Sequence, residues 1–197
     1  MRLVLLGPPG SGKGTQAARL SARLGVPAIS TGQIFESNIE AGTPLGRQAE
    51  SYVRRGELVP DDVVLEMVRE RLLSGPDCAQ GFILDGFPRT LPQAKGLDRY
   101  LAAACGGLDA VIDLDVDDSE VLERIAGRAR IEGRVDDTRE TALNRLKVFS
   151  DETAPLRRYY AERGLLVSVD GTGSPDDVAN RIGAALTARE KSRPRLS

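Results

Sequence analysis

Short runs of apolar residues alternate along the chain with longer segments in which apolar residues recur every three or four positions. The short runs predict five buried strands, at Leu3–Leu6, Ala28-Ile29, Phe82–Leu84, Ala110–Leu114 and Leu165–Val169. The longer segments predict helices over residues 13–24, 34–41, 45–55, 61–73, 90–104, 118–128, 137–163 and 176–188. Buried strands separated by helices indicate an α/β fold, a five-stranded parallel sheet covered by helices on both faces. Such sheets carry ligand sites at the carboxyl ends of their strands.

Three segments depart from this simple alternation. Residues 30–73 hold three helical patterns and no strand, which predicts a helical insertion beside the sheet. Residues 129–136 are polar, contain Gly133 and interrupt two helices, so a short exposed loop is expected there. Residues 191–197 carry Pro194 and three cationic residues and predict a flexible tail. The length of 197 residues otherwise fits one domain.

Composition narrows the range of partners. The chain has 27 basic and 29 acidic residues and a formal charge of −2, so a nucleic-acid partner is not expected. The first apolar run is four residues long, whereas a membrane span needs roughly 20. No targeting signal or membrane contact is therefore expected, and the predicted location is the cytoplasm.

The residue types present also restrict the chemistry. Histidine is absent, which excludes histidine-based acid–base catalysis and histidine metal ligands. The two cysteines, Cys78 and Cys105, are too few for a tetrahedral zinc site, so no zinc is expected. Of the 27 basic residues, 23 are arginine. Catalysis would depend on arginine, lysine, carboxylates, backbone amides or a bound ion.

The segment after the first strand has the composition of a phosphate-binding loop. It reads Gly7-Pro8-Pro9-Gly10-Ser11-Gly12-Lys13-Gly14-Thr15 and opens the first helix. Glycines let consecutive N–H groups surround a phosphate, and Lys13 reaches the β- and γ-phosphates. In the general pattern a hydroxyl residue directly follows the lysine, whereas here Gly14 intervenes before Thr15. The alternative is a glycine-rich turn with an incidental lysine; nucleotide binding is the favoured interpretation.

Further motifs follow in a fixed order, and together they resemble the adenylate kinase family over residues 1–188. They are Ser30-Thr31-Gly32, Gly56-Glu57-Leu58-Val59, Asp85-Gly86-Phe87-Pro88-Arg89-Thr90, Arg134-Val135-Asp136-Asp137 and Val169-Asp170-Gly171-Thr172. The resemblance implies reversible phosphoryl transfer from Mg²⁺·ATP to AMP, giving two ADP, by a monomeric enzyme. It also implies an AMP-binding insertion at about 30–60 and a lid at about 128–137. The lid is of the short form, for which no zinc is expected.

The resemblance assigns residues to the ATP side of the site. ATP would bind the phosphate loop (Gly10, Ser11, Gly12, Lys13, Gly14 and Thr15) together with Arg124, Arg128 and the backbone at Gly173. Asp85, at the end of an apolar strand, and Thr15 would hold Mg²⁺, partly through water. A purely structural role for Asp85 is the alternative.

The AMP side is assigned in the same way. AMP would contact Thr31, Glu36, Glu57, Leu58, Val59, Gly86, Phe87, Arg89 and Gln93, with Gln93 reading the adenine. Arg134 and Arg145 would reach the transferring phosphate and AMP. The implied catalytic set is Lys13, Arg89, Arg128, Arg134 and Arg145. Asp136 and Asp137 fit either a lid hinge or a helix cap.

One segment departs from the family pattern. Ser-Thr-Gly is commonly followed there by Asp, two apolar residues and an Arg that grips the AMP phosphate, but here it is followed by Gln33-Ile34-Phe35-Glu36. A charge-assisted hydrogen bond from that arginine would contribute about 1.5–3 kcal/mol. Its loss predicts that AMP binds about ten- to a hundredfold more weakly. Two alternatives to an active adenylate kinase stay open: a kinase for another nucleoside monophosphate, and a catalytically weakened nucleotide-binding protein.

Overall fold

Five parallel strands form the centre of the described part of the chain. The structure describes residues 1–55, 57–104, 106–132 and 139–192, without the side chains of 128–132, 139–141 and 192. In this computed structural model the strands are β1 (Arg2–Leu6), β2 (Ala28–Ser30), β3 (Phe82–Asp85), β4 (Ala110–Asp115) and β5 (Leu166–Asp170). Their order across the sheet is β2-β3-β1-β4-β5, and every neighbouring pair is parallel. The predicted α/β fold with a five-stranded parallel sheet is confirmed.

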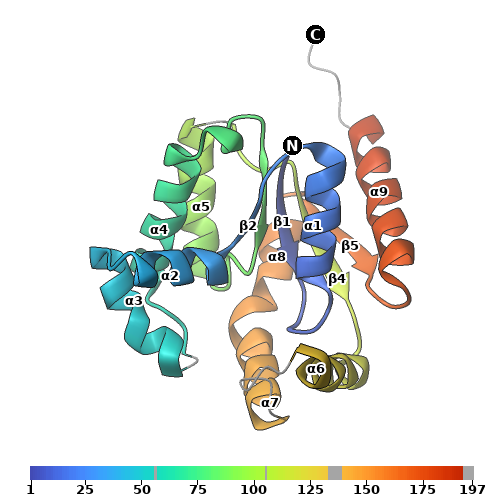
Figure 1. The fold of residues 1–197 in the computed structure, drawn as a ribbon. Helices are drawn as coiled ribbons and strands as arrows, with labels where there is room; N and C mark the ends of the chain where they lie inside the picture. The colour runs from blue at the N-terminus through green and yellow to red at the C-terminus, as the bar shows by residue number, and fades with distance from the viewer. Residues whose placement is uncertain (56, 105, 133–138, 193–197) are drawn as a thin grey trace.

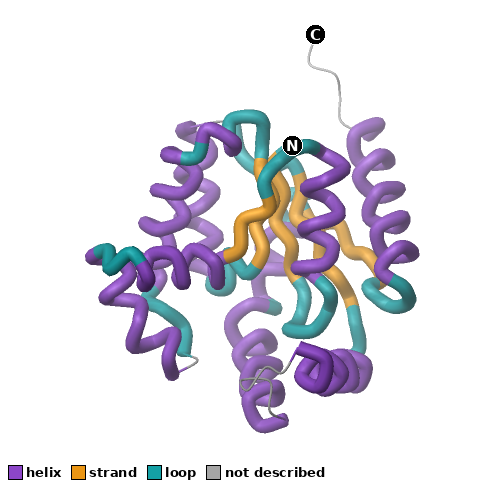
Figure 2. Tube along the Cα trace, in the orientation of Figure 1, coloured by secondary structure: helices purple, strands orange, loops and turns teal. Residues whose placement is uncertain are grey.

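Both faces of the sheet are covered by helices (Figures 1 and 2). Leu3 and Leu5 of β1 belong to a buried cluster with α1 (Lys13–Leu24) and α9 (Pro175–Ser192). Val4 and Leu6 point to the opposite face, where α4 (Asp61–Ser74), α5 (Leu91–Ala104) and α8 (Pro155–Ala161) pack. Successive residues of a strand face opposite sides, so a strand buried on both sides is a continuous apolar run. That is why the unbroken run in β1 predicted its position.

Between β2 and β3 the described chain forms helices joined by short loops, with no strand. α2 (Thr31–Glu40) and α3 (Pro44–Arg55) precede α4, and the short turn η1 (Pro76–Cys78) follows it. α2 begins three residues earlier than predicted, because Thr31 follows β2 directly and its hydroxyl donates to the Gly86 carbonyl. Gly46 allows α3 to approach α2 closely, since a Cβ there would lie 2.1 Å from the Asn38 carbonyl oxygen. The predicted helical character of residues 30–73 thus holds in the described residues.

Sequence predictions about the segment 118–163 are wrong at two places. The single helix expected over 137–163 is divided into α7 (Arg139–Val148), the π-helical turn η2 (Phe149–Thr153) and α8, and residues 137–138 lie outside the described part. Pro155 has no N–H to donate, and the preceding turn widens so that Ala154 N donates to Phe149 O at 2.8 Å. α6 (Asp118–Glu132) continues through residues 129–132, where a loop was expected. These residues include good helix formers and no glycine or proline.

The C-terminal helix also runs beyond its predicted end. α9 extends to Ser192 rather than stopping at residue 188, so the first two residues of the expected tail are helical. Residues 193–197 lie outside the description.

Tyr159 and Tyr160 are adjacent on α8, and their hydroxyl groups differ in hydrogen bonding. Tyr160 is fully buried and its hydroxyl has no hydrogen-bond partner among the described residues. The Tyr159 hydroxyl donates to Asp98 Oδ2 at 2.8 Å, and burial together with the Asp98 carboxylate raises the pKa of Tyr159 to about 12. The two hydroxyl groups therefore make opposite contributions to stability.

We expect Tyr160→Phe to leave the free energy of unfolding unchanged or to raise it by about 1 kcal/mol, because an unpaired buried hydroxyl is costly. Tyr159→Phe should lower it by about 1.5–3 kcal/mol, since a hydrogen bond to a charged acceptor is lost. Urea unfolding of both variants checks this. A loss for Tyr160→Phe as large as that for Tyr159→Phe would contradict the expectation.

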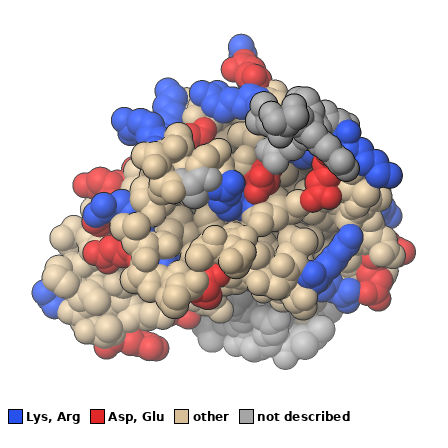
Figure 3. All heavy atoms as spheres, turned by 90° about the horizontal axis from the view of Figure 1, so that it is seen from above, with Lys and Arg blue, Asp and Glu red and all other residues tan. Residues whose placement is uncertain are grey.

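Among the described residues, no helix is long and apolar enough to cross a membrane. Seen from above, from the amino ends of the strands, basic and acidic side chains both occur across the surface (Figure 3). The formal charge of −2 on the whole chain fits this mixture.

Candidate active site

The phosphate loop connects β1 to α1 at the carboxyl edge of the sheet. Gly10 and Gly12 have φ angles of 84° and 92°, values that L side chains rarely adopt. A Cβ on Gly10 would lie 2.9 Å from Ile125 Cγ1, so α6 packs directly against this loop. The Ser11 hydroxyl is buried and has no hydrogen-bond partner among the described residues. The glycines of the motif therefore serve both the turn and the close packing.

Lys13 begins α1, and its ammonium curls back over the loop. Nζ donates to the carbonyl oxygens of Gly7 and Pro8, both at 2.8 Å. The N-terminus of α1 contributes partial positive charge at the same place, which favours an anion. Loop, helix end and ammonium thus form the arrangement expected for binding phosphates.

Asp85 brings a carboxylate to the phosphate loop from the neighbouring strand. It ends β3, which pairs with β1 so that Asp85 stands opposite Leu5. A Cβ on Gly14 would lie 3.5 Å from Asp85 Oδ2, and the exposed Thr15 follows Gly14. The Asp85 carboxylate thus lies next to Gly14, the residue that departs from the general motif. Carboxylate and hydroxyl oxygens are the ligands that Mg²⁺ takes in such sites.

The loop after β3 is built around the Gly86 carbonyl. Gly86 has a φ of 78°, and Phe87 and Pro88 are joined by a cis peptide bond. The Gly86 oxygen accepts from Thr31 Oγ1 at 3.1 Å and from Arg89 Nε at 2.9 Å. A Cβ on Gly86 would lie 2.9 Å from Thr31 Oγ1, so glycine is needed for this contact. Thr31 from α2 and Arg89 from the loop are thereby brought together; the Phe87 side chain is buried in the core instead.

Arg89 lies in a strongly charged environment. Solvent reaches its side chain, yet protein atoms surround it closely enough that desolvation lowers the pKa of the guanidinium. Asp85 opposes this effect, whereas Arg145 of α7 lowers the pKa further. Two arginines from different segments therefore lie near each other and near Asp85. An anionic substrate would relieve the repulsion between them.

Gln93 of α5 supports Arg89 in this structure. Its Oε1 accepts from the Arg89 backbone N at 2.8 Å, and its Nε2 donates to Asp61 Oδ1 at 2.8 Å. The Thr90 hydroxyl donates to the same Asp61 oxygen at 2.8 Å. Gln93 is 2% exposed, so reading an adenine would require it to exchange these bonds. Asp61 was not singled out by the sequence, because a helix-start Asp is an ordinary cap, and Thr90 was named only as part of the motif Asp85–Thr90.

The other residues predicted on the AMP side lie on or after α2 and α3. Val59 is buried and Leu58 half-buried, whereas Glu57 is exposed and pairs with Arg55 at 2.9 Å. Gln33 and Glu36 are exposed on α2, and Glu36 makes no ion pair with a described residue. The insertion's other cations are engaged: Arg54 pairs with Glu50, and Arg47 donates to the Gly42 carbonyl.

On the ATP side, two arginines fix the loop after β5. Arg124 of α6 donates to the Gly171 carbonyl at 3.0 Å and reaches the Ser11 carbonyl at 3.5 Å, which joins this loop to the phosphate loop. Arg181 of α9 donates to the carbonyls of Asp170 and Thr172, at 2.8 and 2.7 Å. Gly173 follows with a φ of 89°. Sequence reasoning missed Arg181, because an arginine on an amphipathic helix gives no distinguishing signal.

The predicted lid residues are the least described. The backbone of Arg128 lies in α6, but its side chain is outside the described part. Arg134, Asp136 and Asp137 also lie outside it. Arg145 is described, on α7.

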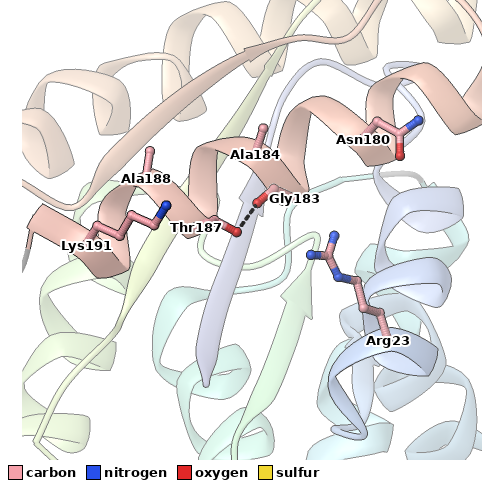
Figure 4. A pocket seen from close by; sticks show the side chains of 7 residues that line it. All are labelled: Arg23, Asn180, Gly183, Ala184, Thr187, Ala188 and Lys191. Carbon is pink, nitrogen blue, oxygen red and sulfur yellow. Dashed lines mark hydrogen bonds between the residues drawn. The ribbon is translucent and has the colours of Figure 1, made fainter.

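A surface depression of about 520 Å³ lies elsewhere, between α1 and α9 (Figure 4). Arg23 lies across Gly183 there, and Lys191 closes one end. Arg23 is ten residues beyond Lys13 on α1, or about 15 Å along the helix, so this depression is distinct from the phosphate loop. No group of three or more potential metal ligands (His, Cys, Asp or Glu) occurs among the described residues.

A phosphate loop and an arginine cluster at the carboxyl edge of a parallel sheet define a P-loop phosphotransferase. A family model described as adenylate kinase matches residues 5–165. A Kocuria rhizophila protein described as adenylate kinase is 54% identical over 185 residues, covering 94% of this chain and 98% of that protein. Similar relatives with the same description come from Thermobifida fusca (50% over 189 residues, 96% and 100% covered) and Stenotrophomonas maltophilia (53% over 188, 95% and 100%). The chain belongs to the adenylate kinase family, and its predicted membership and enzyme class are confirmed.

Proposed function

We propose that this site transfers the γ-phosphoryl group of Mg²⁺·ATP to AMP, giving two ADP. The observation that carries the proposal is the meeting of Lys13, Asp85, Arg89 and Arg145 at one edge of the sheet. Phosphoryl transfer between two anions requires positioning and neutralisation of charge, which these groups supply without histidine. The family membership supports both substrates.

ATP would bind with its phosphates in the loop Gly10–Thr15, where backbone N–H groups and Lys13 meet them. Arg124 already bridges this loop and the Gly171 carbonyl, so it orders both ends of the ATP site. Arg128 and Arg134 would act from the lid, at about residues 128–137. Gly173 would lie beside the adenine, on the loop that Arg124 and Arg181 fix.

The oxygens of Asp85 and Thr15 fit a Mg²⁺ ion. Asp85 Oδ2 approaches the phosphate loop at Gly14, and both groups are hard oxygen donors. When bound there with ATP, Mg²⁺ would neutralise phosphate charge. Asp85 would hold it through water.

AMP would bind on the other side of Asp85, between the insertion at about 30–60 and the loop after β3. Thr31 and Arg89 are positioned by the shared Gly86 carbonyl, and Leu58 and Val59 would line the base. We expect AMP to be the preferred acceptor when AMP, UMP, CMP and GMP are each tested in turn in a coupled ADP assay. Strong turnover with UMP or CMP and none with AMP would contradict the proposal.

Glu36 is proposed to weaken AMP binding. It lies exposed on α2 without an ion pair to a described residue, and Arg54 and Arg55 are engaged by Glu50 and Glu57. We expect Glu36→Arg to lower KM for AMP about ten- to a hundredfold, because a charge-assisted hydrogen bond is added and a repulsion removed. Steady-state rates against AMP at saturating Mg²⁺·ATP check this.

The control for Glu36→Arg is Glu40→Arg, one helical turn further along α2 and also exposed. It makes the same change in net charge, so it should reproduce any general electrostatic effect. Equal KM values for AMP in both variants and the parent would show that Glu36 does not face the AMP phosphate.

We further propose that the enzyme acts as a monomer in the cytoplasm. Residues for both nucleotides come from one chain, so the site needs no second copy. Size-exclusion chromatography with light scattering at assay concentrations tests the oligomeric state.

A further inference from the structure

Asp113 is a buried carboxylate at the phosphate end of β4. Its side chain is only 4% exposed, and β4 pairs with β1 so that Asp113 stands opposite Leu6, one residue before Gly7. Arg157, near the start of α8, brings Nε to 2.7 Å from Asp113 Oδ2. Arg157 Nε has no aligned hydrogen bond, so the contact is an ion pair held by charge. Asp113 Oδ1 is buried and lacks a hydrogen-bond partner among the described residues.

A second cation acts on the same carboxylate. Lys13 Nζ is held by the Gly7 carbonyl, and Gly7 directly follows the residue opposite Asp113. Burial raises the pKa of Asp113, the charges of Arg157 and Lys13 lower it, and Asp115 of the same strand raises it. The facing residues on the neighbouring strands, Leu6 of β1 and Ser168 of β5, carry no charge. Arg157 is thus the close partner of this buried anion, and the charge of Lys13 makes the smaller contribution.

We propose that Arg157 neutralises Asp113 and thereby keeps the Lys13 ammonium available to the phosphates of ATP. Arg157 is then a positioning residue for the reaction, acting through Asp113 on Lys13. The inference rests on the proposed function only in assigning Lys13 to ATP. The ring of Phe149, 5.8 Å from the Arg157 guanidinium carbon, supports Arg157 from the π-helical turn.

The physical basis is the cost of a buried charge without a partner. An isolated carboxylate in a low-dielectric interior attracts any cation that can reach it, and the flexible stem of a lysine can. Without Arg157, Lys13 would be the remaining cation acting on Asp113 among the described residues. Its ammonium would be drawn toward Asp113 and away from the incoming phosphates.

The experiment compares four proteins with the parent: Arg157→Met, Asp113→Asn, the double variant, and Arg158→Met. Arg158 is the matched control, because it is the next residue on α8, is 87% exposed and pairs with Glu162 at 2.8 Å. Calorimetry measures Kd for Mg²⁺·ATP, and steady-state rates give KM for ATP and for AMP. Binding is measured without an acceptor, so this test stands even if AMP proves not to be the acceptor.

We expect Arg157→Met to raise Kd and KM for ATP about tenfold and to leave KM for AMP unchanged. Asp113→Asn and the double variant should stay within about threefold of the parent, because no buried charge remains to attract Lys13. Arg158→Met should match the parent. Unchanged ATP binding in Arg157→Met would overturn the proposal.

The pH dependence separates this role from a packing role. Lowering the pH protonates an Asp113 that has lost its Arg157 partner. The affinity of Arg157→Met for ATP, divided by that of the parent, should therefore rise toward one as the pH is lowered. A double variant that melts like the parent yet binds ATP as weakly as Arg157→Met would overturn the proposal. Should Arg157→Met fail to fold, Asp113→Asn decides: a large loss of ATP affinity there overturns it.

Discussion

Replacing Lys13 with methionine is expected to lower kcat/KM for ATP by about a thousandfold. Lys13 is the cation that the phosphate loop itself supplies, held by the Gly7 and Pro8 carbonyls at 2.8 Å. Removing one preorganised donor from a developing charge costs about 10²–10³ in rate, and weaker ATP binding adds to this loss. Methionine keeps most of the length of the side chain, so the change mainly removes the charge. Steady-state rates at saturating AMP measure it.

The matched control is Lys95→Met, which removes an exposed lysine on α5. It should leave the kinetic constants within about twofold of the parent, because surface charges contribute little. Thermal unfolding of both variants shows whether the fold is kept. A folded Lys13→Met protein that retains more than about a tenth of the parent activity would contradict the assignment of Lys13 to the phosphates.

Replacing Arg89 with methionine should reduce kcat/KM for AMP by about a hundredfold or more while leaving ATP binding intact. Arg89 lies near Asp85 and Arg145, and desolvation and Arg145 lower the pKa of its guanidinium. Charge-assisted hydrogen bonds to a phosphate stabilise a complex by about 1.5–3 kcal/mol each. Rates against AMP and calorimetry with Mg²⁺·ATP separate the two substrates.

Arg99→Met, an exposed arginine on α5, serves as the control for Arg89→Met and should be close to the parent. Equal losses of AMP and ATP affinity in Arg89→Met would indicate a collapsed loop rather than a lost phosphate contact. The hydrogen bond from Thr153 Oγ1 to the Arg89 carbonyl, at 2.9 Å, does not depend on the Arg89 side chain and should preserve the loop.

The central strands β1, β3 and β4 were predictable from the sequence because each is a largely apolar run buried on both faces. The edge strands β2 and β5 are only partly buried, although they too were predicted from apolar runs. The same reasoning failed at Pro155, since helical periodicity continues across η2 and only the missing N–H interrupts the hydrogen bonds. It failed at residues 129–132 because their polar composition predicts a loop, although arginine and glutamate are good helix formers.

Some residues of the candidate site could likewise be predicted from the sequence, and others could not. Lys13, Asp85 and Arg89 stand in motifs whose spacing is local, so the sequence alone placed them. Asp113 and Arg157 meet only through the packing of α8 on β4, and neither residue type nor local spacing marks them. Gln93 could be singled out by its motif, but its bonds to Arg89 and Asp61 depend on the fold.

The Gly86 carbonyl fixes more than the place of Arg89. Because Nε donates to that oxygen, the guanidinium is held by one edge and presents its two terminal nitrogens, which no described residue takes in a hydrogen bond, as a fork of fixed direction. A lysine in the same position would have one nitrogen for both tasks and would have to leave the carbonyl to reach a phosphate. Arginine at position 89 is therefore a requirement of geometry as well as of charge.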